Sequence, residues 1–155
     1  MTTQAPVPTL VPAFDAIVTL GELQDHGPTR AGHRRIIPVT GGSLRGDVEA
    51  EILPGGADWQ IMRTDGALEI DGRYSARTRS GDLVHLRVSG VRSGSPAVLA
   101  SLLAGAEVPP AEYYFRTSVS IETSAPRLEH LQHSLFVASC VRRAATVEYR
   151  AYRVT

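Results

Sequence analysis

Two short segments place chemically active side chains among residues that normally pack in a core. They are residues 54–60 (PGGADWQ) and residues 113–117 (YYFRT). Asp58 can act as a general base or anchor a ligand, and Trp59 beside it can form a stacking wall. Arg116 can hold an anion such as a carboxylate, phenolate or enolate. These residue types together indicate proton transfer on a small organic molecule.

Strand alternation over residues 113–122 adds two partners to this set. Tyr114, Arg116 and Glu122 fall on one face of the expected strand. Tyr114 would be the general acid, Arg116 the anion clamp, and Glu122 or Asp58 the base. We expect these four residues to be catalytic.

Four further residues are expected to bind the substrate. Arg63 and Arg73 can clamp an anion as Arg116 can, and Tyr74 can donate a hydrogen bond to a carbonyl. Trp59 completes this group as an apolar wall.

Each of these roles has a structural alternative. Asp58 could cap the turn formed by the preceding glycines, and Trp59 could fill the core. Arg116 could form a structural ion pair with Glu122 or Asp58, because an unpaired buried charge is costly. A buried tyrosine often does no more than satisfy its own hydroxyl group.

The sequence predicts neither a metal nor a cofactor. His130 and His133 stand three apart with no acidic triad nearby, so no metal is expected. The single cysteine, Cys140, alternates with apolar neighbours and is expected to be a core thiol. The absence of lysine excludes Schiff-base chemistry, a pyridoxal anchor and a P-loop, and no dinucleotide-binding glycine pattern occurs.

Length and charge limit the partners. A chain of 155 residues suits one domain, expected over 13–155 behind a flexible arm at 1–12. With 16 basic and 16 acidic side chains, neither nucleic acid nor a membrane is an expected partner. The basic residues are all arginine, a composition typical of GC-rich bacteria. Since no signal peptide is visible, we expect a cytoplasmic protein that binds a small molecule.

Turn signals recur along most of the chain, at intervals typical of an antiparallel all-β domain. The strands are expected at 13–22, 33–40, 46–53, 57–64, 67–79, 82–92, 112–123, 134–143 and 145–154. Ser95-Pro96 predicts the start of one helix and Gly105 its end, and a short helical turn is possible over 127–133. A closed barrel is favoured over a sandwich, because closure removes exposed sheet edges.

A series of short elements resembles a known family. In order, these elements are TGG (40–42), PGGADWQ (54–60), DG (65–66), RY (73–74), YFRT (114–117), ET (122–123) and LFV (135–137). The series resembles the bacterial and fungal domain of unknown function 3237 family, over about Phe14 to Val154. The resemblance implies a small antiparallel β-barrel, similar in kind to allene oxide cyclase or calycin barrels, often in homodimers or larger assemblies. This chain departs from the pattern at Val119, at Ile121 and at Leu131-Gln132-His133, where members often carry Pro, an aromatic residue and a Trp-Leu-Asn segment.

These observations favour a cofactor-independent enzyme of the isomerase, cyclase or lyase type. It would hold a mostly apolar ligand inside the barrel, with natural-product biosynthesis as the specific version of this hypothesis. A non-catalytic binding barrel, or a structural module with a filled interior, is the alternative.

Overall fold

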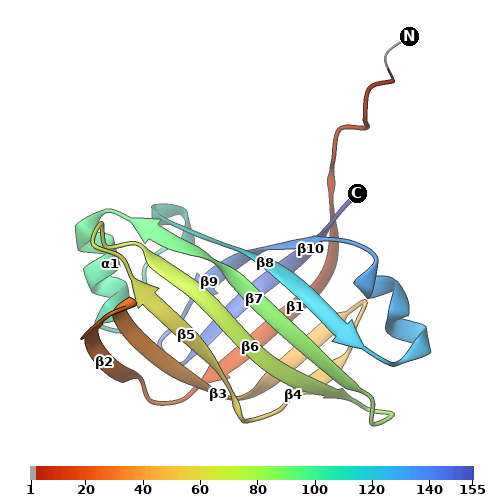
Figure 1. The fold of residues 1–155 in the computed structure, drawn as a ribbon, viewed down its shortest axis with the longest axis horizontal. Coiled ribbons are helices and arrows are strands. Elements are labelled where there is room, and N and C mark those ends of the chain that lie inside the picture. The colour runs from red at the N-terminus through yellow and green to blue at the C-terminus, as the bar shows by residue number, and fades with distance from the viewer. Residues whose placement is uncertain (1–2) are drawn as a thin grey trace.

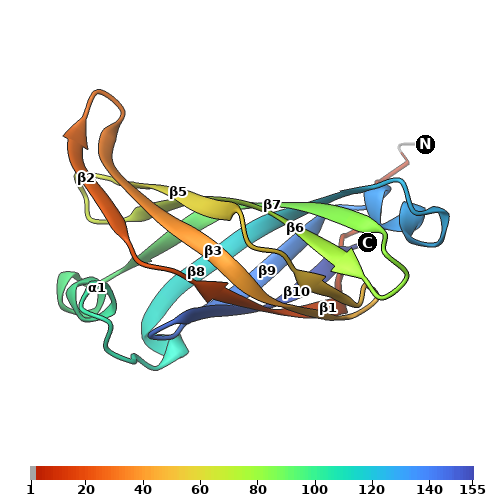
Figure 2. The same ribbon diagram turned by 90° about the horizontal axis from the view of Figure 1, so that it is seen from below.

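The computed structural model describes residues 3–155, which form a closed eight-stranded antiparallel β-barrel with two further strands (Figures 1 and 2). The strands are β1 Leu10–Leu20, β2 Gln24–Thr29, β3 Gly32–Gly46, β4 Ala50–Ile52, β5 Gly56–Met62, β6 Leu68–Thr78, β7 Leu83–Gly94, β8 Tyr113–Thr123, β9 Phe136–Arg142 and β10 Thr146–Val154. The helical segments are α1 Pro96–Leu103 and two 3-10 segments, η1 Pro110–Glu112 and η2 Pro126–Gln132. The predicted barrel is confirmed.

Pairing of β1 with two strands closes the sheet. From β6 to β10 each strand pairs antiparallel with the next, and β10 pairs with β1. β1 also pairs with the second part of β3, which completes the circle. β4 and β5 follow one another in the same position between β3 and β6. β2 pairs with the first part of β3, so this hairpin extends past the wall (Figure 2).

The helix over 96–103 begins and ends as its sequence predicts. The Ser95 hydroxyl accepts a hydrogen bond from the Val98 N–H at 3.2 Å, and Pro96 occupies the first turn. Gly105 follows with a φ of +83°, a conformation that favours glycine. The short turn expected over 127–133 is present as η2.

The predicted elements differ from the structure in three main places. β1 begins at Leu10, within the stretch expected to be a flexible arm over 1–12, because Leu10 pairs there with Val154 of β10. β3 continues through Gly41 and Gly42, where the sequence predicted a break. Gly42 has a φ of +131°, and a Cβ atom there would overlap the carbonyl oxygen of Ile17, so glycine bends the strand without ending it. β2 was missed because its residues, QDHGPT, bury almost nothing and show no apolar alternation.

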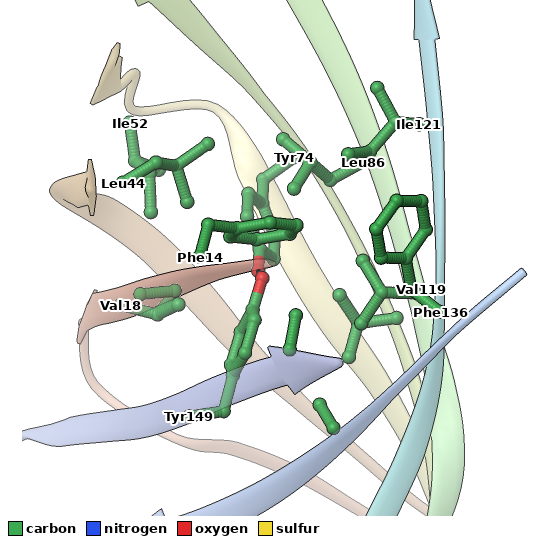
Figure 3. Close-up of a cluster of buried hydrophobic side chains, with 14 of the residues drawn as sticks. Phe14, Val18, Leu44, Ile52, Tyr74, Leu86, Val119, Ile121, Phe136 and Tyr149 are labelled. Carbon is green, nitrogen blue, oxygen red and sulfur yellow. Dashed lines mark hydrogen bonds between the residues drawn. The ribbon is translucent and has the colours of Figure 1, made fainter. Parts of the chain in front are cut away.

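The end of the barrel near η2 is packed solid. The Phe14 ring lies 6.0 Å from that of Phe136 and 6.3 Å from that of Tyr149, measured between centroids (Figure 3). Leu128 and Leu131 of η2 are buried in the same cluster. Fully buried aliphatic side chains complete this core, namely Leu44, Val48, Ile52, Val84 and Leu86.

Gly90 and Gly72 of the barrel wall differ in how closely atoms of the neighbouring strand approach them. This difference allows the close approach of β7 and β8 at Gly90 to be tested. A Cβ atom at Gly90 would overlap the Arg116 carbonyl oxygen of β8, whereas at Gly72 it would meet its nearest atom, the Val88 carbonyl oxygen, at 3.5 Å. Gly90→Ala is therefore expected to lower the free energy of unfolding by about 2 kcal/mol or more. Gly72→Ala, the matched control, should change it by less than about 1 kcal/mol.

Urea unfolding of the two variants measures this difference. Equal losses at the two positions would contradict a close approach of β7 and β8 at Gly90.

Candidate functional site

The barrel interior is not completely filled. A cavity of about 40 Å³, room for a few water molecules, lies among Val18, Val39, Val88, Asp58 and the Tyr74–Tyr149 pair. A wider pocket of about 270 Å³ shares Ile37, Gln60, Arg92 and Arg142 with it. The end of α1 and the loops after β1 and β9 border this second pocket, which we call the mouth.

Asp58 is the carboxyl group of the inner cavity. Its β5 position faces Gly72 of β6 and Ile37 of β3 across the sheet. Gly56 lets β5 approach β6 closely, because a Cβ atom there would overlap the Arg73 carbonyl oxygen. The glycine turn before Asp58 therefore positions this side chain within the wall.

The surroundings of Asp58 favour its neutral form. The residue as a whole is partly buried, yet protein atoms enclose its carboxyl group. Burial raises its pKa from 3.8 to about 6, against the lowering effect of hydrogen bonds from the Gln60 side chain (2.7 Å) and the Asp71 N–H (2.9 Å). Both protonation states are therefore accessible near neutral pH.

Gln60 can match either state of Asp58. Its Nε2 donates to the Asp58 Oδ2, while its Oε1 is buried with no partner among residues 3–155. A half-turn of the amide would present Oε1 as the acceptor for a protonated Asp58. The pair can thus gain or lose a proton without losing its hydrogen bond.

Three arginines converge on the mouth from different strands: Arg35 of β3, Arg92 of β7 and Arg142 of β9. Arg92 and Arg35 are only 4% and 8% exposed. Burial lowers the pKa of all three, and repulsion between the arginines adds to this effect for Arg92 and Arg142. The pKa of Arg92 falls to about 10, so it stays charged at neutral pH.

The other polar groups of the cavity stay uncharged. The Tyr74 and Tyr149 hydroxyls point toward one another (Figure 3) and lie 2.6 Å apart. Burial raises the pKa of both phenols above their ordinary value. Burial also raises the pKa of the Cys140 thiol to about 11. The Thr117 hydroxyl oxygen lies 3.7 Å from the Cys140 sulfur. Cys140 is a buried core thiol, as its neighbours predict.

Of the eight predicted site residues, the structure places two in the interior. Asp58 and Tyr74 line the cavity. Trp59 alternates to the outside, 37% exposed. Arg63 and Arg73 lie on the outer wall in ion pairs with Asp65 and Asp71.

The three predicted site residues of β8 also face outward, which corrects their expected place in the lining. Tyr114 is 53% exposed, and the Arg116 guanidinium lies 5.5 Å from its ring while donating to the Phe115 carbonyl. Glu122 is exposed. No ion pair joins Arg116 to Glu122 or Asp58 in the described chain. The alternation separated the two faces correctly, but the inward face is the apolar one.

Sequence reasoning missed four residues at the mouth, Arg35, Gln60, Arg92 and Arg142, and it missed Tyr149 in the inner cavity. A signal for them exists in the alternation. Val84, Leu86, Val88 and Gly90 occupy every second position of β7 and Arg92 ends this row, just as Arg142 ends the row of Ala138 and Cys140 in β9. A charged residue that ends an inward-facing row marks an end of the barrel.

Neither a metal-binding cluster nor a membrane-spanning helix occurs in residues 3–155. Their His, Cys, Asp and Glu side chains form no group of three that could hold a metal ion. None of the helices there has the length and apolar character needed to cross a membrane.

Comparisons with known proteins agree with this fold. A family model described as "Protein of unknown function (DUF3237)" matches residues 8–154. The UPF0311 protein RPA1785 of Rhodopseudomonas palustris is 35% identical over 142 residues, 91% of this chain and 93% of that protein. A crystal structure of RPA1785, a conserved protein of unknown function, covers 98% of this chain and 100% of that one at 33% identity, with a TM-score of 0.91.

Two other solved structures are similar. A beta-barrel like protein from Acinetobacter baumannii AYE is 37% identical, covers 99% of this chain and 100% of that one, and has a TM-score of 0.86. An enzyme from Penicillium herquei covers both chains completely at 16% identity and a TM-score of 0.71, a likeness of fold alone.

Replacement of Asp58 by Asn, which cannot ionise, tests its environment. The pKa of Asp58 is higher in the folded protein, about 6, than in the unfolded chain, where 3.8 is ordinary. The folded state therefore binds the proton more tightly, and Asp58 makes the wild type lose stability as pH rises from about 4 to about 6. At pH 7, Asp58→Asn should exceed the wild type in free energy of unfolding by on the order of 2 kcal/mol, an advantage that disappears below about pH 4.

Urea unfolding of both proteins between pH 4 and 7 gives this comparison. Glu122→Gln removes an exposed carboxylate and serves as the control, with no comparable change. A gap between Asp58→Asn and the wild type that does not vary with pH would contradict the buried, raised-pKa carboxyl.

Proposed function

Because the chain belongs to the DUF3237 family, which is described only as of unknown function, its activity must be inferred from the barrel interior. We propose that the protein is a cofactor-independent enzyme that isomerises or cyclises a mostly apolar small molecule by proton transfer through Asp58. The observation that carries this proposal is the place of Asp58, a hydrogen-bonded carboxyl group in the lining of an apolar cavity that shares four residues with the mouth.

Asp58 would move the proton in both directions. As a carboxylate it removes a proton from a carbon or hydroxyl group of the ligand and becomes neutral, while the ligand becomes an enolate or alkoxide. It then returns the proton to another atom of the ligand, so the product is an isomer and no oxidant or reductant is consumed. The Gln60 amide follows the change by exchanging its donor for its acceptor.

The two buried tyrosines can support the negative charge on the ligand. Two hydroxyl groups carry two hydrogens, and the bond between Tyr74 and Tyr149 uses one. The second hydrogen is free to point into the cavity and to donate to an oxygen of the ligand. An O–H donor held in place in an apolar cavity stabilises an enolate more strongly than water does.

The apolar lining supports the choice of ligand. Val18, Val39, Ile70, Val88 and Phe115 surround the same cavity, which favours a hydrocarbon or aromatic skeleton. The cavity itself is narrow, so the mouth would hold most of the ligand while its reacting part reaches Asp58.

A narrower version of the proposal is a cyclase in natural-product biosynthesis, and the related alternative is a lyase, in which the ligand loses a leaving group after the same deprotonation. The fold shared with an enzyme of Penicillium herquei supports catalysis in a barrel of this type, and the lysine-free composition suits a GC-rich bacterial host. Association into homodimers or larger homo-oligomers, and a cytoplasmic location, belong to the same proposal.

Hydrogen–deuterium exchange in model ketones that stand in for the substrate tests the proton transfer. Neutral cyclic and aromatic ketones (2-tetralone, 1-indanone and phenylacetone) would be incubated with the protein in deuterated buffer at pH 7. We expect loss of the α-proton NMR signal above the buffer rate for at least one ketone, and a decrease of at least about 100-fold in that excess for Asp58→Asn. The excess should increase with pH through about 6, because the base must be ionised.

Glu122→Gln is the matched control, since it removes a carboxylate of the outer wall, and it should exchange like the wild type. Equal rates for the wild type and Asp58→Asn with every ketone would overturn the proposal. Binding of a ketone without any exchange would instead favour a non-catalytic binding barrel.

A further inference from the structure

Unpartnered polar atoms gather at the mouth. In residues 3–155, three buried side-chain nitrogen or oxygen atoms have no hydrogen-bond partner: Arg35 Nε, Gln60 Oε1 and Arg92 Nε. All three residues line the mouth, together with Arg142. A buried donor without a partner costs free energy, and such groups in a folded protein call for an explanation. Their concentration in one pocket indicates a binding site whose ligand would supply the missing hydrogen-bond partners.

Charge at the mouth is unbalanced. Within the described chain, no carboxylate oxygen lies within 4.0 Å of a guanidinium nitrogen of Arg35, Arg92 or Arg142. By contrast, six arginines of the exterior do have such a partner: Arg63, Arg73, Arg87, Arg127, Arg143 and Arg150. Even an ionised Asp58 would offset one of the three positive charges. Two of these three arginines, Arg35 and Arg92, are buried, and a buried charge is the kind that most needs a counter-ion.

Two of these arginines are held in place by contacts that leave charge uncompensated. Arg142 Nη1 donates to the backbone carbonyls of Arg143 and Thr146, at 2.6 and 3.2 Å. The Arg92 guanidinium lies 5.8 Å from the centre of the Phe115 ring. Neither a carbonyl group nor a ring neutralises a full positive charge, but both fix its position. The site is therefore preorganised for an anion.

The surroundings indicate an organic anion. Leu23, Leu102 and Leu103 border the mouth beside the arginines, and the apolar cavity continues inward from it. A volume of about 270 Å³ exceeds what a small inorganic ion needs. Guanidinium groups bind carboxylates and other oxyanions through parallel N–H donors.

We propose that Arg35, Arg92 and Arg142 form the binding site for the anionic group, a carboxylate or phenolate, of an aromatic or cyclic ligand. The ring of this ligand would extend toward Asp58. The inference rests on the proposed function in one respect, since it names the substrate class of the same interior. Anion binding can nevertheless be measured without turnover.

Benzoate is the probe, and benzamide is its neutral counterpart of nearly the same shape. Isothermal titration and thermal unfolding of the full chain at pH 7 and constant ionic strength would compare the two. We expect saturable binding of benzoate and an increase in Tm of several degrees at millimolar concentration, with at least tenfold weaker binding of benzamide. Inorganic phosphate should bind more weakly than benzoate, because it makes no apolar contact.

Substitution of Arg92 distinguishes a role in anion binding from a role in the stability of the fold. Arg92→Met should weaken benzoate binding at least tenfold while raising the Tm of the free protein, because it removes a buried charge that has no counter-ion. Arg77→Met, on the exposed outer face of β6, is the matched control and should bind benzoate like the wild type. Arg35→Gln provides a second test at the mouth should Arg92→Met fold poorly.

Asp58→Asn distinguishes this inference from the proposed function. It should bind benzoate at least as tightly as the wild type, because it removes the nearby negative charge, although it no longer exchanges ketone protons. Equal binding of benzoate and benzamide would overturn the anion site. So would unchanged benzoate binding in both Arg92→Met and Arg35→Gln.

Discussion

Closure of the sheet through the pairing of β1 with β3 governs the packing and the charge of the whole interior. A closed wall turns one side of every strand away from bulk water, so each inward side chain must pack against others or find a polar partner inside. Glycines make this closure possible where backbones approach, as Gly42 does beside Ile17. The buried core and the buried charges are both consequences of it.

The interior is divided along the barrel axis. Around Phe14 and Phe136 it is filled with apolar side chains, which supply the favourable free energy of burial. Toward α1 it holds a carboxyl group, an amide and three guanidinium groups, and three of these side chains each have a buried atom without a hydrogen-bond partner in residues 3–155. One half stabilises the fold, and the other carries an unfavourable arrangement of charge that the packed half must offset. Such local destabilisation is typical of sites that bind or react.

The carboxyl group and the arginines belong to one electrostatic system. The positive charge of Arg92 lowers the pKa of Asp58, although burial outweighs it and keeps that pKa near 6. An anion bound at the mouth would reduce this positive influence and favour the protonated form of Asp58. Ligand charge and the protonation of the candidate base are thereby coupled through the same few residues. That coupling suits a site in which one carboxyl group both accepts and returns a proton.

Local signals in the chain were enough to predict the barrel, most strand positions and the capped helix, because alternation, turn glycines and the Ser95-Pro96 cap act over a few residues. They also pointed to Asp58 and Tyr74 as interior residues. They could not establish which face of β8 turns inward, since Tyr114, Arg116 and Glu122 alternate in the same way whether they meet water or a lumen. Nor could they show that Arg35, Arg92 and Arg142 meet, because strands far apart in the chain bring them to one end only when the barrel closes. Burial and convergence are properties of the closed barrel, and they fix where the candidate site lies.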